Sequence, residues 1–458
     1  MRSRIKIAAG CVAQFVLCAA LGAPCAGATL STSTPRGVKT VSIPVAGRKP
    51  EICVVPKHFP GGQYSDKDAS SESELCGLNE RTNAAVCPKT NSTNPGLDFY
   101  GLPDGATPKS VEDAHCKNAK MVAKYKLSTS CSYTPSILGY YHMSRILGGV
   151  ADAPPAVVRT FDLQQHIAQG RIAMAEVPAS ALIHQTWAAL MAQLTAGAKA
   201  TKRDLLLTDD FTQSYGALSV SPKKESFYKE FFSGGANNVA RAANFRDKNP
   251  IVQMLARPAD ASALVGRSFT AQNVQTMMQL KDAADLIVID TLMNQQDRFG
   301  NIHYLETYYY LDRKDQNPDG TPKLKSSRKL KPEEVTQLGA VQIKTMLLKD
   351  NDCGVDKTNI AKQAGLAQRI AHIDPVTYRR LLQLDAMMDS PATREFFSQE
   401  LLFTASDYAG FRQNLKDLAT RLHQACSQGK LKLDLDLQAH FSGAALKPPS
   451  CEVSGGMQ

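Results

Sequence analysis

Residues 286–304 read LIVIDTLMNQQDRFGNIHY and combine an apolar run with a short polar loop. The run ends in Asp297-Arg298, Asn301 follows the aspartate by four residues, and a second apolar, aromatic run then begins. Further along, another apolar run ends in residues 349–354, KDNDCG. This set matches what phosphoryl transfer requires. One carboxylate must lie near the attacking hydroxyl, and an amide and a second carboxylate must hold magnesium against nucleotide phosphates.

Each motif alone also fits a purely structural role. Asp297-Arg298 could be a surface ion pair, and residues 350–352 a turn, because Asp and Asn are common turn formers. Their order favours function, since residues 302–311 and 340–348 resemble two arms of a hairpin that would bring Asp350 and Asp352 beside Asn301. Carboxylate and amide oxygens suit magnesium, which prefers oxygen ligands.

The N-terminus predicts export. Residues 2–6 carry three basic side chains, residues 7–21 form a short apolar stretch, and residues 26–28 (AGA) offer a small-residue cleavage site. The apolar stretch is too short to span a bilayer comfortably. We therefore expect residues 1–28 to be a removable signal peptide, and the mature protein to be secreted or periplasmic without stable membrane insertion.

The cysteines support an oxidising compartment. Eight of the eleven lie beyond the signal segment: Cys53, Cys76, Cys87, Cys116, Cys131, Cys353, Cys426 and Cys451. An even number in an exported chain predicts up to four disulfides rather than buried free thiols. We expect a bridge from Cys353 that clamps the acidic segment, with Cys426 as a candidate partner. The nine histidines show no ligand spacing and no Cys-x-x-Cys occurs, which argues against zinc.

Charge and length exclude some classes of function. The formal net charge of +10 falls to +7 without the three basic residues of the signal segment, and this modest excess favours anionic ligands or simple solubility. No basic patch is interleaved with aromatic residues, which argues against nucleic-acid binding. A mature chain of about 430 residues is long enough for a two-lobed enzyme.

Periodicity divides the chain into a strand-containing front and a helical back. Residues 29–115 predict a loop-rich segment of short strands stapled by disulfides, 119–127 a strand, 136–147 a helix, and 150–159 an extended segment. From about residue 178 we expect mostly helix, at 178–199, 271–293, 359–404 and 407–426, with low-complexity loops at 312–331 and after 442. The expected units are 1–28, 29–115, 116–190 and 191–458.

Together these motifs resemble the catalytic and metal-binding loops of atypical secretory-pathway kinases, the Golgi casein kinase family, and their bacterial spore-coat relatives. A second motif, YHMSRILGGVADAPP at residues 141–155, is similar to the N-lobe helix of that family and the Val-Pro-Pro that follows it. The two matches cover about half of the chain. They imply an α+β, protein-kinase-like two-lobed fold, with a strand-containing N-lobe and a mostly helical C-lobe, stabilised by disulfides.

The resemblance also implies roles for the acidic residues. Asp297 would be the catalytic carboxylate near the acceptor hydroxyl, and Asn301 would contact metal and nucleotide. Asp350 corresponds best to the metal-binding aspartate of the family, whereas Asp352 matches the Asp-Phe-Gly pattern of ordinary kinases. Both acids stay candidates for binding Mg²⁺ or Mn²⁺ with ATP.

The nucleotide lysine should lie on the strand before the helix. Lys124 is the first choice and Lys126, on the same face of that strand, is the second. Residues 114–151 contain no Asp or Glu to pair with it, so the acid would have to come from elsewhere, and Glu176 is one candidate. Phe299 stands where the family has His, and no glycine-rich phosphate loop precedes Lys124.

The favoured function is ATP-dependent phosphorylation of a hydroxyl-bearing protein or sugar. The alternative is a pseudokinase-like binding or regulatory protein without transfer activity, which the missing acidic partner supports. A third interpretation is a secreted structural protein whose Asp-Arg-x-x-Asn sequence has no catalytic meaning.

Overall fold

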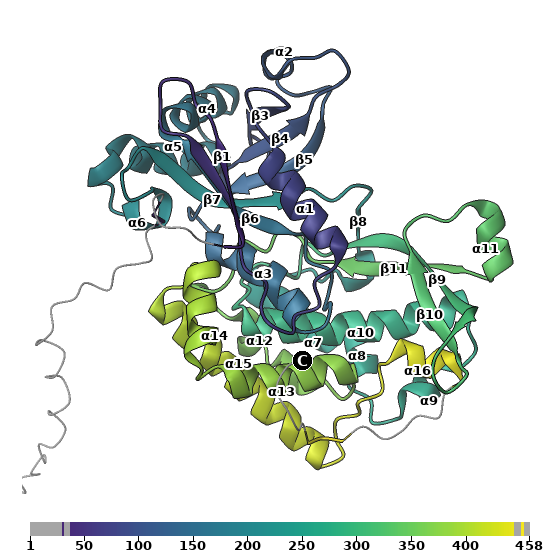
Figure 1. The fold of residues 1–458 in the computed structure, drawn as a ribbon. Coiled ribbons are helices and arrows are strands. Elements are labelled where there is room, and N and C mark those ends of the chain that lie inside the picture. The colour runs from purple at the N-terminus through teal and green to yellow at the C-terminus, as the bar shows by residue number, and fades with distance from the viewer. Residues whose placement is uncertain (1–29, 32–36, 444–449, 453–458) are drawn as a thin grey trace, which may run out of the picture.

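The computed structural model describes residues 30–31, 37–443 and 450–452. The predicted signal segment, 1–28, lies outside these residues. In the described ranges no helix is both long and apolar enough to cross a membrane. The chain forms a sheet-containing part built around antiparallel strands and a larger, mostly helical part (Figure 1).

The first part contains a seven-stranded antiparallel sheet. Its strands are, in spatial order, β1 (Lys39–Ile43), β2 (Glu51–Val55), β6 (Ala156–Asp162), β7 (Gln213–Val220), β5 (Lys120–Lys126), β4 (Leu97–Gly101) and β3 (Ala84–Pro88). The sheet therefore crosses both expected boundaries, at 115/116 and 190/191. Strands β1 to β4 come from the segment expected to be loop-rich, and β7 from the segment expected to be helical. Such pairings between distant segments leave no periodic signal in the sequence.

Helices cover both faces of this sheet. They are α1 (Asp66–Gly77), α2 (Pro108–Asp113), α3 (Thr134–Ile146), α4 (Leu163–Glu176), α5 (Leu182–Ala196), η1 (Gly197–Lys199) and α6 (Arg203–Leu206). Val157 and Phe161 of β6 belong to the same core as Trp187 of α5, whereas Val158 belongs to the core that contains Tyr140 of α3. Alternate residues of a strand point to opposite faces, so each face of the sheet has its own core. The predicted strand at 119–127 and helix at 136–147 are confirmed.

The second part is organised around α10 (Ala271–Leu292). Every residue from 282 to 292 is buried, including Asp285 and Asp290, which form ion pairs with Lys281 and Arg298. Asn294, with a φ of 51°, adopts the left-handed conformation that asparagine tolerates, and the helix ends there. The other helices are η2 (Lys229–Phe231), α7 (Asn238–Lys248), α8 (Pro250–Leu255), α9 (Ala261–Val265), α11 (Pro332–Leu338), α12 (Ile360–Gln363), η3 (Leu366–Arg369), α13 (Pro375–Met387), α14 (Pro391–Glu395), η4 (Phe396–Glu400), α15 (Ala405–Ser427) and α16 (Leu437–Ser442).

A smaller antiparallel sheet lies against α10. Strand β9 (His303–Gln316) is central and pairs with β8 (Ser226–Phe227), β10 (Pro322–Ser327) and β11 (Val341–Leu347). The predicted pairing of the two apolar runs is confirmed by the β9–β11 register. The low-complexity loop expected at 312–331 was wrong, because the end of β9 and all of β10 form a hairpin there. Lys325 forms cross-strand ion pairs with Asp312 and Asp315, so charged residues occupy strands and not a loop.

Four disulfides stabilise the fold: Cys53–Cys76, Cys87–Cys116, Cys131–Cys353 and Cys426–Cys451. The α+β class, with a strand-containing first part, a mostly helical second part and disulfides, is confirmed. The expected bridge from Cys353 is confirmed, but the candidate partner Cys426 was wrong. Cys353 instead pairs with Cys131, because the segment after β11 lies against the segment that joins β5 to α3. Disulfides in this number are typical of an oxidising, extracytoplasmic compartment.

Candidate functional site

Two loops form one wall of the candidate site: residues 295–302 after α10, called the Asp-Arg loop, and residues 349–354 after β11, called the acidic loop. Arg298 joins them. Its guanidinium, 1% exposed, donates to both carboxylate oxygens of Asp290 on α10 at 3.0 and 3.3 Å and to the Asn351 side-chain oxygen at 2.8 Å. Arg298 is therefore buried and connects α10 to the acidic loop, and the alternative of a surface ion pair was wrong for this residue.

An ion pair between β5 and the acidic loop lies at the centre of the site. The Lys126 Nζ atom is 2.9 Å from Asp352 Oδ2 and 3.6 Å from Asp350 Oδ1. Burial alone would lower the pKa of Lys126, but the charges of the two aspartates outweigh it and raise that pKa. Burial likewise opposes ionisation of Asp350 and Asp352, yet Lys126 lowers both of their pKa values. All three groups are therefore charged at neutral pH.

Hydrogen bonds hold the acidic loop in place. Asn301 donates its side-chain amide to Asp350, and its amide oxygen accepts no hydrogen bond from any other described residue. The backbone N–H of Tyr133 donates to the Asp352 carbonyl at 2.8 Å, which ties the loop to the start of α3. Asp350 has a φ of 54°, in the left-handed region that aspartate, like asparagine, adopts more readily than most other non-glycine residues.

The predicted residues surround one cavity of about 250 Å³. It is lined by Lys89, Asn91, Ser92, Thr93, Asn94, Lys124, Lys126, Asp297, Asn301, Asp350, Asp352 and Cys353. The structure thus brings together the residues to which the sequence assigned catalytic, nucleotide and metal roles: Lys124, Lys126, Asp297, Asn301, Asp350 and Asp352. Both lysines line the cavity, but Lys126, the second choice, is the one that forms ion pairs with Asp350 and Asp352.

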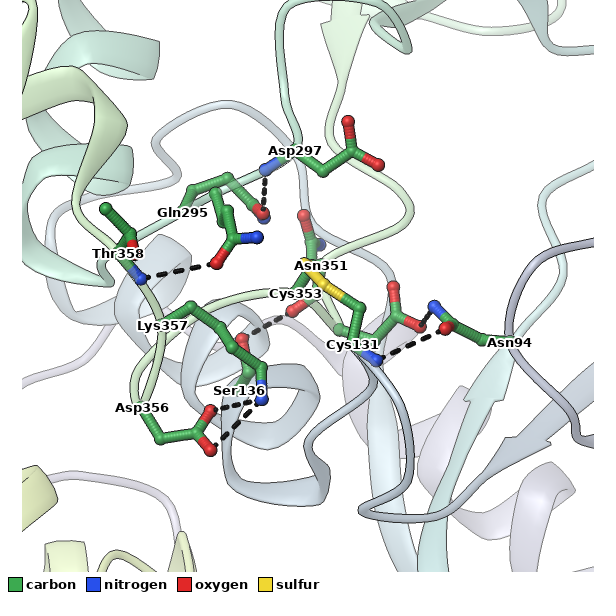
Figure 2. Close-up of a disulfide and its surroundings, with 12 residues drawn as sticks. Asn94, Cys131, Ser136, Gln295, Asp297, Asn351, Cys353, Asp356, Lys357 and Thr358 are labelled. Carbon is green, nitrogen blue, oxygen red and sulfur yellow. Dashed lines mark hydrogen bonds and ion pairs between the residues drawn. A yellow bond between two sulfur atoms is a disulfide. The ribbon is translucent and has the colours of Figure 1, made fainter. Parts of the chain in front are cut away.

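Asp297 lies at the rim of this cavity. Its side chain is 56% exposed, and its backbone N–H donates to the Gln295 side chain at 3.1 Å. Figure 2 shows its carboxylate directed away from the Cys131–Cys353 disulfide, whereas the Asn94 side chain lies beside Cys131. A carboxylate in this position is accessible to a molecule approaching from solvent.

Sequence reasoning missed the contribution of the β3–β4 turn. Asn94 in this turn donates to Asp352 at 3.3 Å, and burial lowers the pKa of Lys89, just after β3, to about 8. The available signal was residues 91–96, NSTNPG, a turn rich in Ser, Thr and Asn. Residues 91–94 of this turn line the cavity, and the turn precedes Lys124 in the sequence, where no glycine-rich phosphate loop is present.

The proposed acidic partner from α4 was also wrong. Glu176 forms an ion pair with His115 and does not line the cavity. An acid that sequence reasoning did not consider, Asp98, is buried on β4 directly opposite Lys124 in the strand register. Burial raises the pKa of Asp98, and the neighbouring lysines, foremost Lys89, oppose this.

The donor set fits a hard cation in part. Among the described residues no three His, Cys, Asp or Glu side chains are grouped to hold a metal by themselves. Asp350, Asp352 and the Asn301 amide are oxygen donors, and magnesium is commonly held by one or two carboxylates together with substrate phosphates. A metal here would accordingly depend on a nucleotide for some of its ligands.

Comparisons with known proteins assign no family. No family model matches the chain, and no curated protein matches it. The crystal structure of the Golgi casein kinase with Mn/ADP bound is 13% identical, with a TM-score of 0.40, over 84% of this chain and 80% of that one. The structure of hydra Fam20 with sugar is 11% identical, with a TM-score of 0.41, over 81% of this chain and 95% of that one. Similarity at this level does not establish an activity.

Proposed function

We propose that this protein is an extracytoplasmic atypical kinase that transfers the γ-phosphoryl group of ATP to a hydroxyl on a protein or a sugar. The observation that best supports this is the Lys126–Asp352 ion pair beside the Asn301–Asp350 contact. Three separate segments of the chain meet there, and each brings a group that phosphoryl transfer requires.

The side chains of the cavity would bind different parts of the metal–nucleotide complex. Lys126 and Lys124 present positive charge to the phosphates, and the aspartate ion pair keeps Lys126 charged where an unpaired buried lysine would lose its proton. Mg²⁺ or Mn²⁺, held by Asp350, Asp352 and Asn301, would neutralise charge on the phosphate oxygens.

Asp297 acts on the acceptor. It orients the acceptor hydroxyl and accepts its proton while the new P–O bond forms and the bond to the β-phosphate oxygen breaks, which releases ADP. Its place at the exposed rim of the cavity, and not beside Lys126, suits a group that meets a second substrate.

Nucleotide binding and transfer are measured on the same variants. Manganese–ATP should raise the melting temperature of the wild type, because a ligand that prefers the native state stabilises it. Lys126→Met and Asp350→Ala should abolish this shift, whereas Lys120→Met, at the exposed start of the same strand, should retain it. Asp297→Ala should retain the shift but lower incorporation of labelled phosphate by about 10²-fold or more.

The alternative is a pseudokinase-like protein without transfer. It is favoured by the absence of an acid on α3 and by a cavity smaller than the roughly 300–1,000 Å³ of typical ligand sites. Wild-type protein that binds ATP without transferring phosphate would support this alternative. A wild type that does neither would contradict both proposals.

A further inference from the structure

Arg241 of α7 approaches Asp297 from outside the cavity. Its Nη1 atom lies 4.0 Å from Asp297 Oδ1, yet Arg241 does not line the cavity that contains Lys126. The same Nη1 atom donates a hydrogen bond to the Asn238 side-chain oxygen, one turn earlier on the same helix, at 3.4 Å. The guanidinium therefore lies near the Asp297 carboxylate without lining the cavity that contains Lys126.

Gly300 provides the space for this approach. A Cβ atom at position 300 would lie 3.0 Å from Arg241 Nη1 and 3.5 Å from Arg241 Cζ. The φ of Gly300 is outside the left-handed region, so the backbone conformation does not require glycine. A Cβ atom at position 300 would require the guanidinium to move by a few tenths of an ångström from its place beside the Asp-Arg loop.

Asp297 needs an external contact to be held in one orientation. Its side chain makes no other ion pair or hydrogen bond with a described residue and is 56% exposed. An exposed side chain with no partner samples several rotamers, and holding one of them has an entropic cost. The structure offers Arg241 as the group that can restrict it.

We propose that Arg241 is the positioning residue of Asp297, and that glycine at position 300 admits its guanidinium. This inference rests on the proposed kinase function and adds to it a residue outside the nucleotide cavity. Because the contact is long and exposed, it contributes little to stability. Its effect falls on the rate of transfer, where small displacements of a catalytic group are costly.

The first experiment compares steady-state transfer in four single variants. Arg241→Ala and Gly300→Ala should each lower kcat by about 10-fold or more while manganese–ATP affinity and melting temperature stay unchanged. Arg241→Lys should retain part of the rate. Arg246→Ala, later on the same helix, is the matched control and should leave kcat unchanged. Wild-type kcat in Arg241→Ala would overturn the inference.

A double-mutant cycle tests whether Arg241 acts through Asp297. In an Asp297→Ala background, Arg241→Ala should cause no further loss of labelled phosphate incorporation, because its target is already absent. A further fall of similar size would show that Arg241 contacts the transferred group itself and would overturn the positioning role. A wild type without any transfer would refute the proposed function and this inference together. If the wild type transfers phosphate and the Arg241 variants transfer it at the same rate, the inference is refuted and the proposed function is not.

Discussion

Replacing Arg298 with methionine should both destabilise the protein and release the acidic loop. Arg298 and Asp290 are each 1% exposed, and their ion pair is almost completely removed from water. In the variant, the Asp290 carboxylate would keep only the Tyr140 hydroxyl, which donates to it at 2.6 Å. Leaving one charge of a buried pair uncompensated typically costs about 3–5 kcal/mol. We expect a loss of that size in the free energy of unfolding.

The assay is urea unfolding with the disulfides intact. Arg412→Met provides the matched control, because its pair with Asp389 is exposed and should contribute at most about 1 kcal/mol. The double variant Arg298→Met with Asp290→Asn should recover part of the loss, since no buried charge is left unpaired.

The same variant tests the link to function. Arg298 also donates to the Lys349 carbonyl at 2.9 Å and to the Asn351 side chain, so its loss frees the loop that carries Asp350. Manganese–ATP affinity should therefore fall in Arg298→Met. A destabilisation no larger than that of Arg412→Met, or a double variant as unstable as the single one, would refute the reasoning.

Three further predictions concern titration and cross-linking. Burial lowers the pKa of Lys89 to about 8. ATP affinity, measured by calorimetry, should therefore fall between pH 7 and 9 as this lysine loses its charge. In Lys89→Met the affinity should depend less on pH over the same range. Burial raises the pKa of Glu80 from 4.5 to about 7, so its contribution to stability is complete below pH 4.5 and is lost as pH rises through 7. The urea midpoint should therefore fall between pH 4.5 and about 7 in the wild type, and fall less in Glu80→Gln. Replacing Cys131 and Cys353 with serine removes a cross-link between residues 222 positions apart, and should lower the free energy of unfolding by about 5 kcal/mol in the chain-entropy model. Wild-type stability of this double variant in urea would contradict the prediction.

The local pattern of the sequence was sufficient for the main elements. The apolar run at 286–292 predicted a buried helix end, the alternation at 119–127 predicted a strand, and the paired runs around 302 and 347 predicted that Asp350 would return to Asn301. These predictions succeeded because burial and backbone period are recorded within each segment. The catalytic, nucleotide and metal roles of the residues stay predictions.

Contacts between distant segments were decided by the tertiary structure alone. Lys124 and Lys126 lie two residues apart on the same face of one strand, and only the packing of the acidic loop shows that Lys126 forms the ion pairs with Asp350 and Asp352. The same holds for Asp98, which lies opposite Lys124 only because β4 pairs with β5.

The partner of Cys353 and the approach of Arg241 were likewise invisible in the sequence. Eight cysteines allow about 105 pairings, and nothing in their spacing distinguishes Cys131 from Cys426 as the partner. Gly300 reads as an ordinary loop glycine until α7 places a guanidinium 3.0 Å from where its Cβ would be. Residue type and local period determine which groups are present and which segments are buried. Which groups meet depends on how segments far apart in the chain pack, and only the folded chain contains that information.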